Sequence, residues 1–394
     1  MNLVFISPHF PLYFYNFCDR LKKREVNVLG IGDTSYEELP EHTKNALTEY
    51  YRVDDLEDYE SIYRACAYFT WHYGHIDWIE SQNEYWLELE ATLRNEFNVT
   101  TGPKIQHLAP MKYKSKMKDV YKAAGIPTAR YRQVDDYLAT KAFANRVGYP
   151  VIVKPDNGVG ATSTYKLSND DELDYFFATK DSHIHFIIEE MVPGHVETFD
   201  GITDKDKNIL IATSHVMLNS IMDNVNEASD TAFYSQPVEG LDLYDIGKKA
   251  VEAFDTRSRF FHFEFFRLDE DKEGLGKKGD IVGLEVNMRA PGAYMPDMMN
   301  FAYNVDVYTI WADMVKYNKC FYDIKRQYWV AYTGRRDGIW YMHNYDQIRE
   351  KYGNQVALET DVPEALAAAM GNHVFIVKAR TQLSLIHISE PTRP

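Results

Sequence analysis

The sequence predicts an α/β (α+β) protein of two or three compact domains. At 394 residues, 45% of them hydrophobic, the chain is long enough and apolar enough to bury several cores. Its first residues follow a strand–helix–strand order, which predicts a parallel sheet with right-handed crossovers. Farther along, two strand-like segments, Tyr149–Ala161 and Gly283–Arg289, carry charged side chains suited to binding phosphate and metal.

Residues 1–105 are expected to form a small Rossmann-like unit, with a strand at Leu3–Ile6, a helix at Phe14–Lys23 and a second strand at Val26–Leu29. The segment 30–33 matches only a fragment of a dinucleotide fingerprint and is interpreted as a turn. Residues 77–84 lead into a helix at Tyr85–Phe97. Their acidic side chains either line a cleft edge or belong to the helix cap.

Residues 106–315 are expected to form a second domain, whose lid lobe spans about 113–190. Its expected helices are Met111–Ala124, 135–147 and Asp170–Ala178, and its expected strands are Val151–Lys154, Thr164–Leu167, Phe186–Glu189, Ile209–His215, Phe261–Arg267 and Ile281–Met288. Residues 316–381 should add an α/β extension with a helix at Tyr345–Tyr352 and a strand at Val374–Lys378. Residues 382–394 resemble translated sequencing-adapter DNA and are expected to be a non-native tail.

Composition narrows the function classes. The net charge of −16 argues against nucleic-acid binding, and the densest basic run, 112–122, is interpreted as one helix with a local phosphate-facing role. No apolar run reaches the roughly 18 residues that a membrane span needs. The three cysteines are far apart, which argues against a disulfide framework or a Cys/His metal site. A cytoplasmic protein without membrane or nucleic-acid partners is expected.

Two lysines are candidate phosphate ligands. Lys154 ends an apolar strand and precedes a loop containing Gly158 and Gly160, whose backbone can approach a phosphate closely. The alternative is a strand-end lysine whose ammonium reaches solvent. Lys114 lies on the helix before Gly125, and there the alternative is a solvated basic helix face.

The apolar strand ending in Glu189 and Glu190 continues into Met191, Val192 and a turn. The backbone of this segment could pair with adenine, with Glu189 accepting from an exocyclic amine. The alternative is a strand end with solvated acids.

A third group of candidates lies on two later strands. Glu285, Asn287 and Arg289 share one face of their strand because side chains alternate with period two. Glu264 sits within an aromatic strand and needs a partner. The partner could be Mg²⁺ shared with Glu285 and Asn287, or an arginine such as Arg267 or Arg289. His262 and His215 are interpreted as packing or hydrogen-bonding residues.

Taken together, these segments resemble the ATP-grasp superfamily of carboxylate–amine and carboxylate–thiol ligases over residues 1–315. The resemblance implies an N-terminal Rossmann-like pre-ATP-grasp domain followed by a two-lobed ATP-grasp domain. It also implies a role for each candidate. ATP phosphates would be bound by Lys114 and Lys154, and the lid loop would include Gly158 and Gly160. Adenine would be framed by Glu189, Glu190, Met191 and Val192. Mg²⁺ (or Mn²⁺) would be held by Glu264, Glu285 and Asn287, and the transferring group would be stabilised by Arg289.

Two features depart from the family pattern. The glycine loop is short, and Val196 stands where many relatives have a ribose-binding acid, with Glu197 one residue later. The function implied is an ADP-forming ligase that activates a small carboxylate as an acyl phosphate for attack by an amine, and a homodimer is the common state of relatives. A bicarbonate-using carboxylase or carbamoyl-phosphate-synthase-like enzyme and a non-catalytic nucleotide-binding module are the alternatives.

Overall fold

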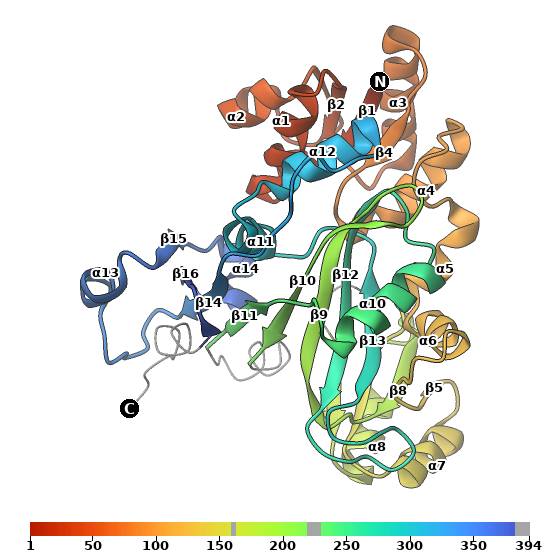
Figure 1. Cartoon of the computed structure of the whole chain (residues 1–394). Coiled ribbons are helices and arrows are strands. Elements are labelled where there is room, and N and C mark those ends of the chain that lie inside the picture. Colours follow the sequence, from red (N-terminus) through yellow and green to blue (C-terminus); the bar gives the residue numbers. More distant parts are fainter. Residues whose placement is uncertain (159–162, 219–229, 383–394) are drawn as a thin grey trace.

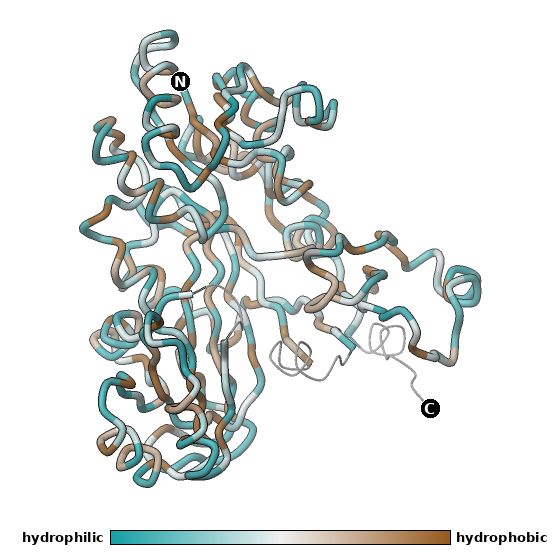
Figure 2. The backbone as a smooth tube through the Cα atoms, turned by 180° about the vertical axis from the view of Figure 1, so that it is seen from behind, coloured by the Kyte–Doolittle hydropathy of each residue, from teal (hydrophilic) through white to brown (hydrophobic). Residues whose placement is uncertain are grey.

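The computed structural model describes residues 1–158, 163–218 and 230–382, and these residues contain three β-sheets (Figure 1). One sheet belongs to the N-terminal unit and one to the lid lobe. The third belongs to a central lobe, which also includes the C-terminal strands. This mixed arrangement confirms the predicted α/β (α+β) class. None of the helices in the described ranges is long and apolar enough to cross a membrane. Figure 2 shows hydrophobic and hydrophilic segments alternating along the chain, as in a protein with several small cores.

The N-terminal unit is a four-stranded parallel sheet with the order β3-β2-β1-β4. Its strands are β1 (Asn2–Ile6), β2 (Asn27–Gly32), β3 (Glu49–Arg52) and β4 (Trp78–Glu80). Its helices are α1 (Tyr15–Lys22), α2 (Glu41–Ala46), α3 (Tyr59–Tyr73) and α4 (Leu87–Glu96), with short 3₁₀ turns η1 (Leu12–Phe14), η2 (Tyr36–Glu38), η3 (Glu84–Trp86) and η4 (Ile105–His107). The expected strand–helix–strand start is confirmed.

The lid lobe is a four-stranded antiparallel sheet with the order β5-β8-β6-β7. Its strands are β5 (Tyr131–Gln133), β6 (Val151–Pro155), β7 (Tyr165–Leu167) and β8 (Phe186–Glu190), and helices α7 (Tyr137–Val147) and α8 (Asp170–Thr179) accompany them. Apolar side chains of both helices, including Phe143 and Phe176, form a small core with Val151 and Val153 of β6. The lid therefore has its own hydrophobic core.

The prediction of one continuous helix over Met111–Ala124 is wrong. The chain forms two helices there, α5 (Ala109–Lys112) and α6 (Lys114–Ala123). Tyr113 between them is extended, with ψ 121°. Asp156 explains the break. Its backbone oxygen accepts from Lys114 N at 2.8 Å, and its carboxylate accepts from Ser115 N at 2.7 Å. These bonds satisfy free N–H groups at the start of α6 and tie the helix to the end of β6.

The central lobe is an eight-stranded sheet with the order β13-β12-β9-β10-β11-β14-β16-β15. Its strands are β9 (Gly194–Thr203), β10 (Ile209–Met217), β11 (Ala232–Gln236), β12 (Arg259–Leu268), β13 (Ile281–Asn287), β14 (Trp329–Arg335), β15 (Val356–Asp361) and β16 (His373–Ala379). Its helices are α10 (Asp242–Ala253), α11 (Met295–Tyr303), α12 (Val307–Tyr317), α13 (Tyr345–Tyr352) and α14 (Glu364–Met370). The residues expected to form a C-terminal extension thus add strands to the same sheet, while the domain limits themselves stay predictions.

The two faces of β12 explain how this sheet can be both a core and a site. Phe261, Phe263 and Phe265 point to one face and are fully buried, in a cluster that includes side chains of α6 and α10. His262 and Glu264 alternate with them and point to the other face. The apolar face anchors the strand, which leaves the polar face available for chemistry.

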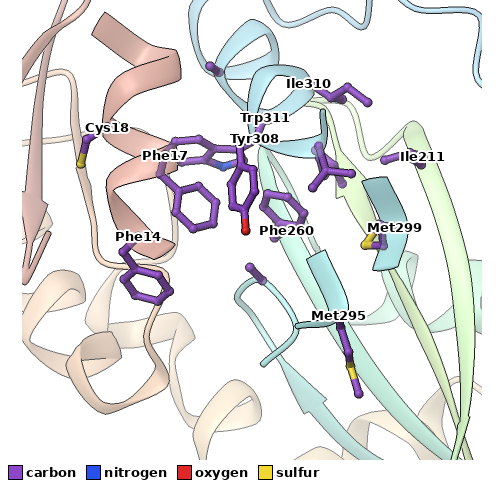
Figure 3. Packing of buried hydrophobic residues seen from close by; sticks show 14 of the residues in the cluster. Phe14, Phe17, Cys18, Ile211, Phe260, Met295, Met299, Tyr308, Ile310 and Trp311 are labelled. Atoms are coloured by element: carbon purple, nitrogen blue, oxygen red, sulfur yellow. The ribbon is translucent and has the colours of Figure 1, made fainter. Parts of the chain in front are cut away.

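A second core joins the N-terminal unit to the central lobe (Figure 3). The ring of Phe17 on α1 lies 4.9 Å from Tyr308, 5.2 Å from Trp311 and 5.9 Å from Phe260, measured between ring centroids in edge-on arrangements. Tyr308 and Trp311 belong to α12, which returns from the central lobe to pack on α1 (Figure 1). Such aromatic packing holds the two units in a fixed relation.

A buried charge network reinforces this junction. The Arg94 guanidinium of α4 donates to Glu80 at 3.1 Å and to Glu90 at 2.8 Å, and Arg259 of β12 donates to the same Glu80 oxygen at 3.1 Å. All four side chains are at most 3% exposed. Burial raises the pKa of Glu90 to about 7 even though Arg94 opposes the shift. The network links the end of β4 to the first residue of β12.

We predict that Arg94→Met lowers the free energy of unfolding by about 3–5 kcal/mol, because it leaves buried carboxylates without their partner. Arg64→Met is the matched control, since Arg64 and Glu60 form a pair with side chains 72% and 60% exposed. That change should cost under ~1 kcal/mol. Urea unfolding of both variants measures the difference, and equal losses would contradict the role given to the network.

Candidate functional site

The site is built on the antiparallel pair β12 and β13. Their register places Glu264 directly opposite Glu285 and His262 directly opposite Asn287. Side chains that are directly opposite share a face, so both carboxylates and the amide point to the polar side of the sheet. Two carboxylates at this spacing repel each other unless a cation lies close by.

The first such cation is Lys114, in the first turn of α6. Its Nζ lies 2.9 Å from Glu285 Oε1 and donates to the Gly158 carbonyl oxygen at 3.1 Å. Burial lowers the pKa of Lys114, but the Glu285 carboxylate outweighs it and leaves the pKa raised. This lysine therefore stays protonated and joins the first part of the glycine loop to the sheet.

Close packing of α6 on β13 puts Lys114 in that position. A Cβ on Gly283 would lie 3.0 Å from the ring of Tyr121, so glycine is what allows the helix to approach. The Tyr121 hydroxyl donates to the Glu285 carbonyl oxygen at 3.4 Å, and Gly283 N donates to the Pro127 carbonyl at 2.8 Å. The chain around Gly283 is thus shaped to receive α6.

A second group of charges lies in the lid. The Glu189 carboxylate, at the end of β8, has Lys154 Nζ 3.0 Å from Oε2 and Lys118 Nζ 3.0 Å from Oε1. Burial alone would raise the pKa of Glu189, but the two lysines lower it to about 2. Lys118 lies one helical turn after Lys114 on the same face of α6. The helical period is the signal that could have identified Lys118 from the sequence.

The segment after Glu189 has a different environment. The Glu190 side chain points away from the lysines and accepts from Arg130 N at 2.7 Å and from the Arg130 guanidinium at 2.6 Å. Val192 packs in a small apolar cluster with Ala129, Leu268 and Val282. Met191 and Val192 connect β8 of the lid to β9 of the central sheet. Any contact of Glu190 with a nucleotide is therefore expected from its backbone.

Arg289 lies just beyond β13 and faces the N-terminal unit. Its guanidinium donates to the Ala290 carbonyl at 2.9 Å and lies 3.5 Å from Glu84 Oε2. Burial raises the pKa of Glu84, Arg289 opposes the shift, and Glu285 adds to it. A hollow lies between the N-terminal unit and the central lobe. The residues that line it include Gln82, Asn83, Glu84, Leu87, Met288 and Arg289. Asn83 caps η3 and Glu84 lies in its first turn, which confirms the capping interpretation of the 77–84 segment, while a role of its acidic residues at a cleft edge stays a prediction.

A buried hydrogen-bond network reaches Glu264 through His262. Asp200 of β9 bonds to His262 Nδ1 at 2.5 Å and to His215 Nδ1 at 2.7 Å, and His262 Nε2 lies 3.2 Å from Glu264 Oε1. Although burial lowers the pKa of His262, Asp200 and Glu264 raise it to about 9. The two histidines are therefore hydrogen-bonding residues, as expected, and the partner of Glu264 is His262 and neither of the arginines considered.

The donor set suits a hard divalent cation. Across the described ranges, no group of three or more His, Cys, Asp and Glu side chains could hold a metal ion by itself. Glu264, Glu285 and the 5% exposed Asn287 offer two carboxylates and one amide. Mg²⁺ takes oxygen ligands of this kind and completes its shell with water and substrate phosphates. The side chains therefore fit a magnesium ion that arrives with a nucleotide.

The structure brings together the predicted side chains of Lys114, Glu264, Glu285 and Asn287 on one face, with Lys154 and Glu189 on the lid and Arg289 at the opposite edge. Gly158 contributes its carbonyl group, and Gly160 lies outside the described residues. Sequence reasoning missed Lys118 and Asp200. Nothing in the local sequence around Asp200 signals its role, because its partners come from two other strands.

The chain is similar in sequence to two kinds of known protein. Residues 113–224 match the family model described as the ATP-binding domain of the carbamoyl-phosphate synthase L chain. An L-arginine-specific L-amino acid ligase of Bacillus subtilis is 24% identical over 310 residues, which cover 76% of this chain and 70% of the relative.

Solved structures share the fold. An L-amino acid ligase from Bacillus licheniformis superimposes with a TM-score of 0.73 at 14% identity, covering 98% of this chain and 95% of the other. The chain resembles the ATP-grasp superfamily in its fold and in its match to an ATP-binding domain. The biotin carboxylase domain of the Hydrogenobacter thermophilus 2-oxoglutarate carboxylase, a dimer in complex with MgADP, ADP and bicarbonate, gives a TM-score of 0.67 at 16% identity, with 96% of this chain and 86% of the other covered. The predicted order of an N-terminal unit and a two-lobed ATP-grasp domain is confirmed.

We predict that Glu285→Gln lowers the Mg²⁺-dependent turnover of this protein at least about 100-fold, because loss of a direct ligand should cost no less than the 10–100-fold loss seen for partners of metal ligands. The amide keeps the shape but removes the charge that both Mg²⁺ and Lys114 require. A Mg²⁺ titration of ADP release measures the effect. Glu239→Gln, at an exposed position, is the control and should leave the titration unchanged. A normal titration for Glu285→Gln would remove Glu285 from the metal site.

Proposed function

We propose that this ATP-grasp enzyme is an ADP-forming ligase that joins the carboxylate of one L-amino acid to the amine of another. The carboxylate–amine chemistry is the activity expected of the fold and site. The assignment of amino acids as substrates is supported by the two L-amino acid ligases that the chain resembles. A cytoplasmic homodimer using Mg²⁺, or Mn²⁺ in its place, is part of the proposal.

The observation that carries the proposal is the opposed pair Glu264 and Glu285 with Lys114 and Arg289 around it. A module that only binds a nucleotide has no need of two facing carboxylates on the floor of the site. We assign Glu264, Glu285 and Asn287 to Mg²⁺, Lys114 and Lys154 to phosphates, Gly158 and Gly160 to the lid loop, the 189–192 segment to adenine, and Arg289 to the transferring group.

The chemistry follows from charge. A carboxylate oxygen attacks the γ-phosphorus of ATP, the bond from that phosphorus to the bridging oxygen breaks, and ADP leaves. Bound Mg²⁺ would supply charge neutralisation on the phosphate oxygens. Lys114 and Arg289 offer fixed positive charge on either side of the metal carboxylates, so no reorganisation is needed as charge develops. The amine then attacks the acyl carbon, loses a proton and displaces phosphate.

The second candidate is a carboxylase that uses bicarbonate as its acid. It is favoured by the structural similarity to the biotin carboxylase domain, which was solved with bicarbonate. Both candidates produce ADP and phosphate, so they differ in the acid that is phosphorylated. The ligase is favoured over the carboxylase because two of the proteins that the chain resembles are L-amino acid ligases, and one of them gives the higher TM-score, 0.73 against 0.67 for the biotin carboxylase domain.

We predict that the purified enzyme with ATP, Mg²⁺, a matching amino acid and hydroxylamine forms the amino acid hydroxamate, because hydroxylamine intercepts the acyl phosphate. ADP and phosphate should appear in equal amounts with it. Screening the twenty amino acids singly and in pairs identifies the donor and the acceptor by mass spectrometry of dipeptides. Turnover with bicarbonate alone would favour the carboxylase. AMP and pyrophosphate as main products would contradict both candidates.

A further inference from the structure

Lys118 is a buried cation that the proposed chemistry does not use. Its side chain is 2% exposed, which is rare for a lysine unless it is paired. In the part of the chain that the structure describes, Glu189 is the one carboxylate within ion-pair distance of either Lys118 or Lys154. Moving an ammonium group from water into a buried position costs free energy, so a functional role for Lys118 would explain its burial.

The charge count around Glu189 is uneven. One carboxylate faces two ammonium groups, each 3.0 Å away and on a different oxygen. The three side chains are 2%, 6% and 10% exposed for Lys118, Glu189 and Lys154. The cluster therefore holds one surplus positive charge in a poorly solvated place, where an incoming phosphate would be attracted strongly.

The positions of the two lysines in the fold indicate which of them is placed to bind a phosphate. Lys154 ends β6 at the start of the glycine loop, whose Gly158 carbonyl is bound by Lys114. Lys118 lies one turn deeper along α6, and its Nζ is 5.7 Å from the centre of the Tyr131 ring on β5. Burial lowers the pKa of Lys118, Glu189 opposes this, and Lys154 adds to it. Lys154 is thus next to the glycine loop, and Lys118 lies at the other oxygen of the Glu189 carboxylate.

We propose that Lys118 is a positioning residue that neutralises and holds Glu189, so that the Lys154 ammonium is free to bind a nucleotide phosphate. Without Lys118, Glu189 and Lys154 would form a closed neutral pair that phosphate has to break. The inference rests on the proposed function in that it takes the occupant of this site to be an adenine nucleotide. Lys118 itself need not touch the nucleotide.

A double-mutant cycle tests the proposal by calorimetric titration of the full chain with MgADP. Lys118→Met should weaken binding about tenfold, because the Glu189 carboxylate is then uncompensated and holds the Lys154 ammonium more strongly against phosphate. In a Glu189→Gln background, where there is no carboxylate to neutralise, the same change should alter the dissociation constant less than about threefold. Lys118→Arg should restore most of the affinity, and Lys122→Met, on the exposed side of the same helix, should have no effect.

The outcomes separate the two levels of the argument. Equal losses in both backgrounds would mean that Lys118 acts directly or only as packing, and would overturn the positioning role while leaving the proposed function intact. Failure of the wild-type protein to bind any adenine nucleotide would overturn both. If Lys118→Met does not fold, as judged by thermal unfolding, the cycle with Lys118→Gln and the rescue by Lys118→Arg give the same decision.

Discussion

Glu264 and Glu285 face each other across two adjacent strands, and this pairing of like charges is the constraint on which the rest of the site depends. Carboxylates directly opposite each other destabilise a sheet unless cations compensate them. In this protein one cation comes from elsewhere in the fold, since Lys114 reaches Glu285 from α6. The other is His262, which lies two residues before Glu264 on β12 and is held by Asp200 of β9. The remaining demand for positive charge is what a bound Mg²⁺ ion would satisfy.

The surrounding architecture holds these charges in register. Phenylalanines on the back of β12 bury that face of the strand, so the polar face cannot turn inward. Phe17, Tyr308 and Trp311 fix the N-terminal unit, which brings Glu84 to Arg289. The lid has its own core and its own charge cluster at Glu189, and α6 spans both lobes with Lys114 and Lys118. Movement of the lid would therefore displace Lys154 and Glu189, the proposed phosphate-binding side, more than Glu264 and Glu285, which we propose to bind the metal.

Much of this could be predicted from the sequence, because strand alternation alone puts Glu285, Asn287 and Arg289 on one side and Lys154 at a strand end. Three features could not be predicted from the sequence. The break at Tyr113 depends on Asp156, which is more than 40 residues away in the chain. The bonds from Asp200 to His262 and His215 depend on the order β12-β9-β10, which no local pattern specifies. The addition of β14, β16 and β15 to the central sheet depends on long-range pairing with β11, so the C-terminal residues were expected to be a separate extension.

The central claim is that a carboxylate oxygen of the donor substrate attacks the γ-phosphate on this charged floor. The most direct measurement uses a donor amino acid labelled with ¹⁸O in its carboxylate, with ATP, Mg²⁺ and the acceptor, followed by mass spectrometry of the released phosphate. The account predicts one ¹⁸O atom in each phosphate, because the labelled oxygen bridges carbon and phosphorus in the acyl phosphate and leaves with phosphorus. Phosphate without ¹⁸O, or label found in AMP, would contradict it.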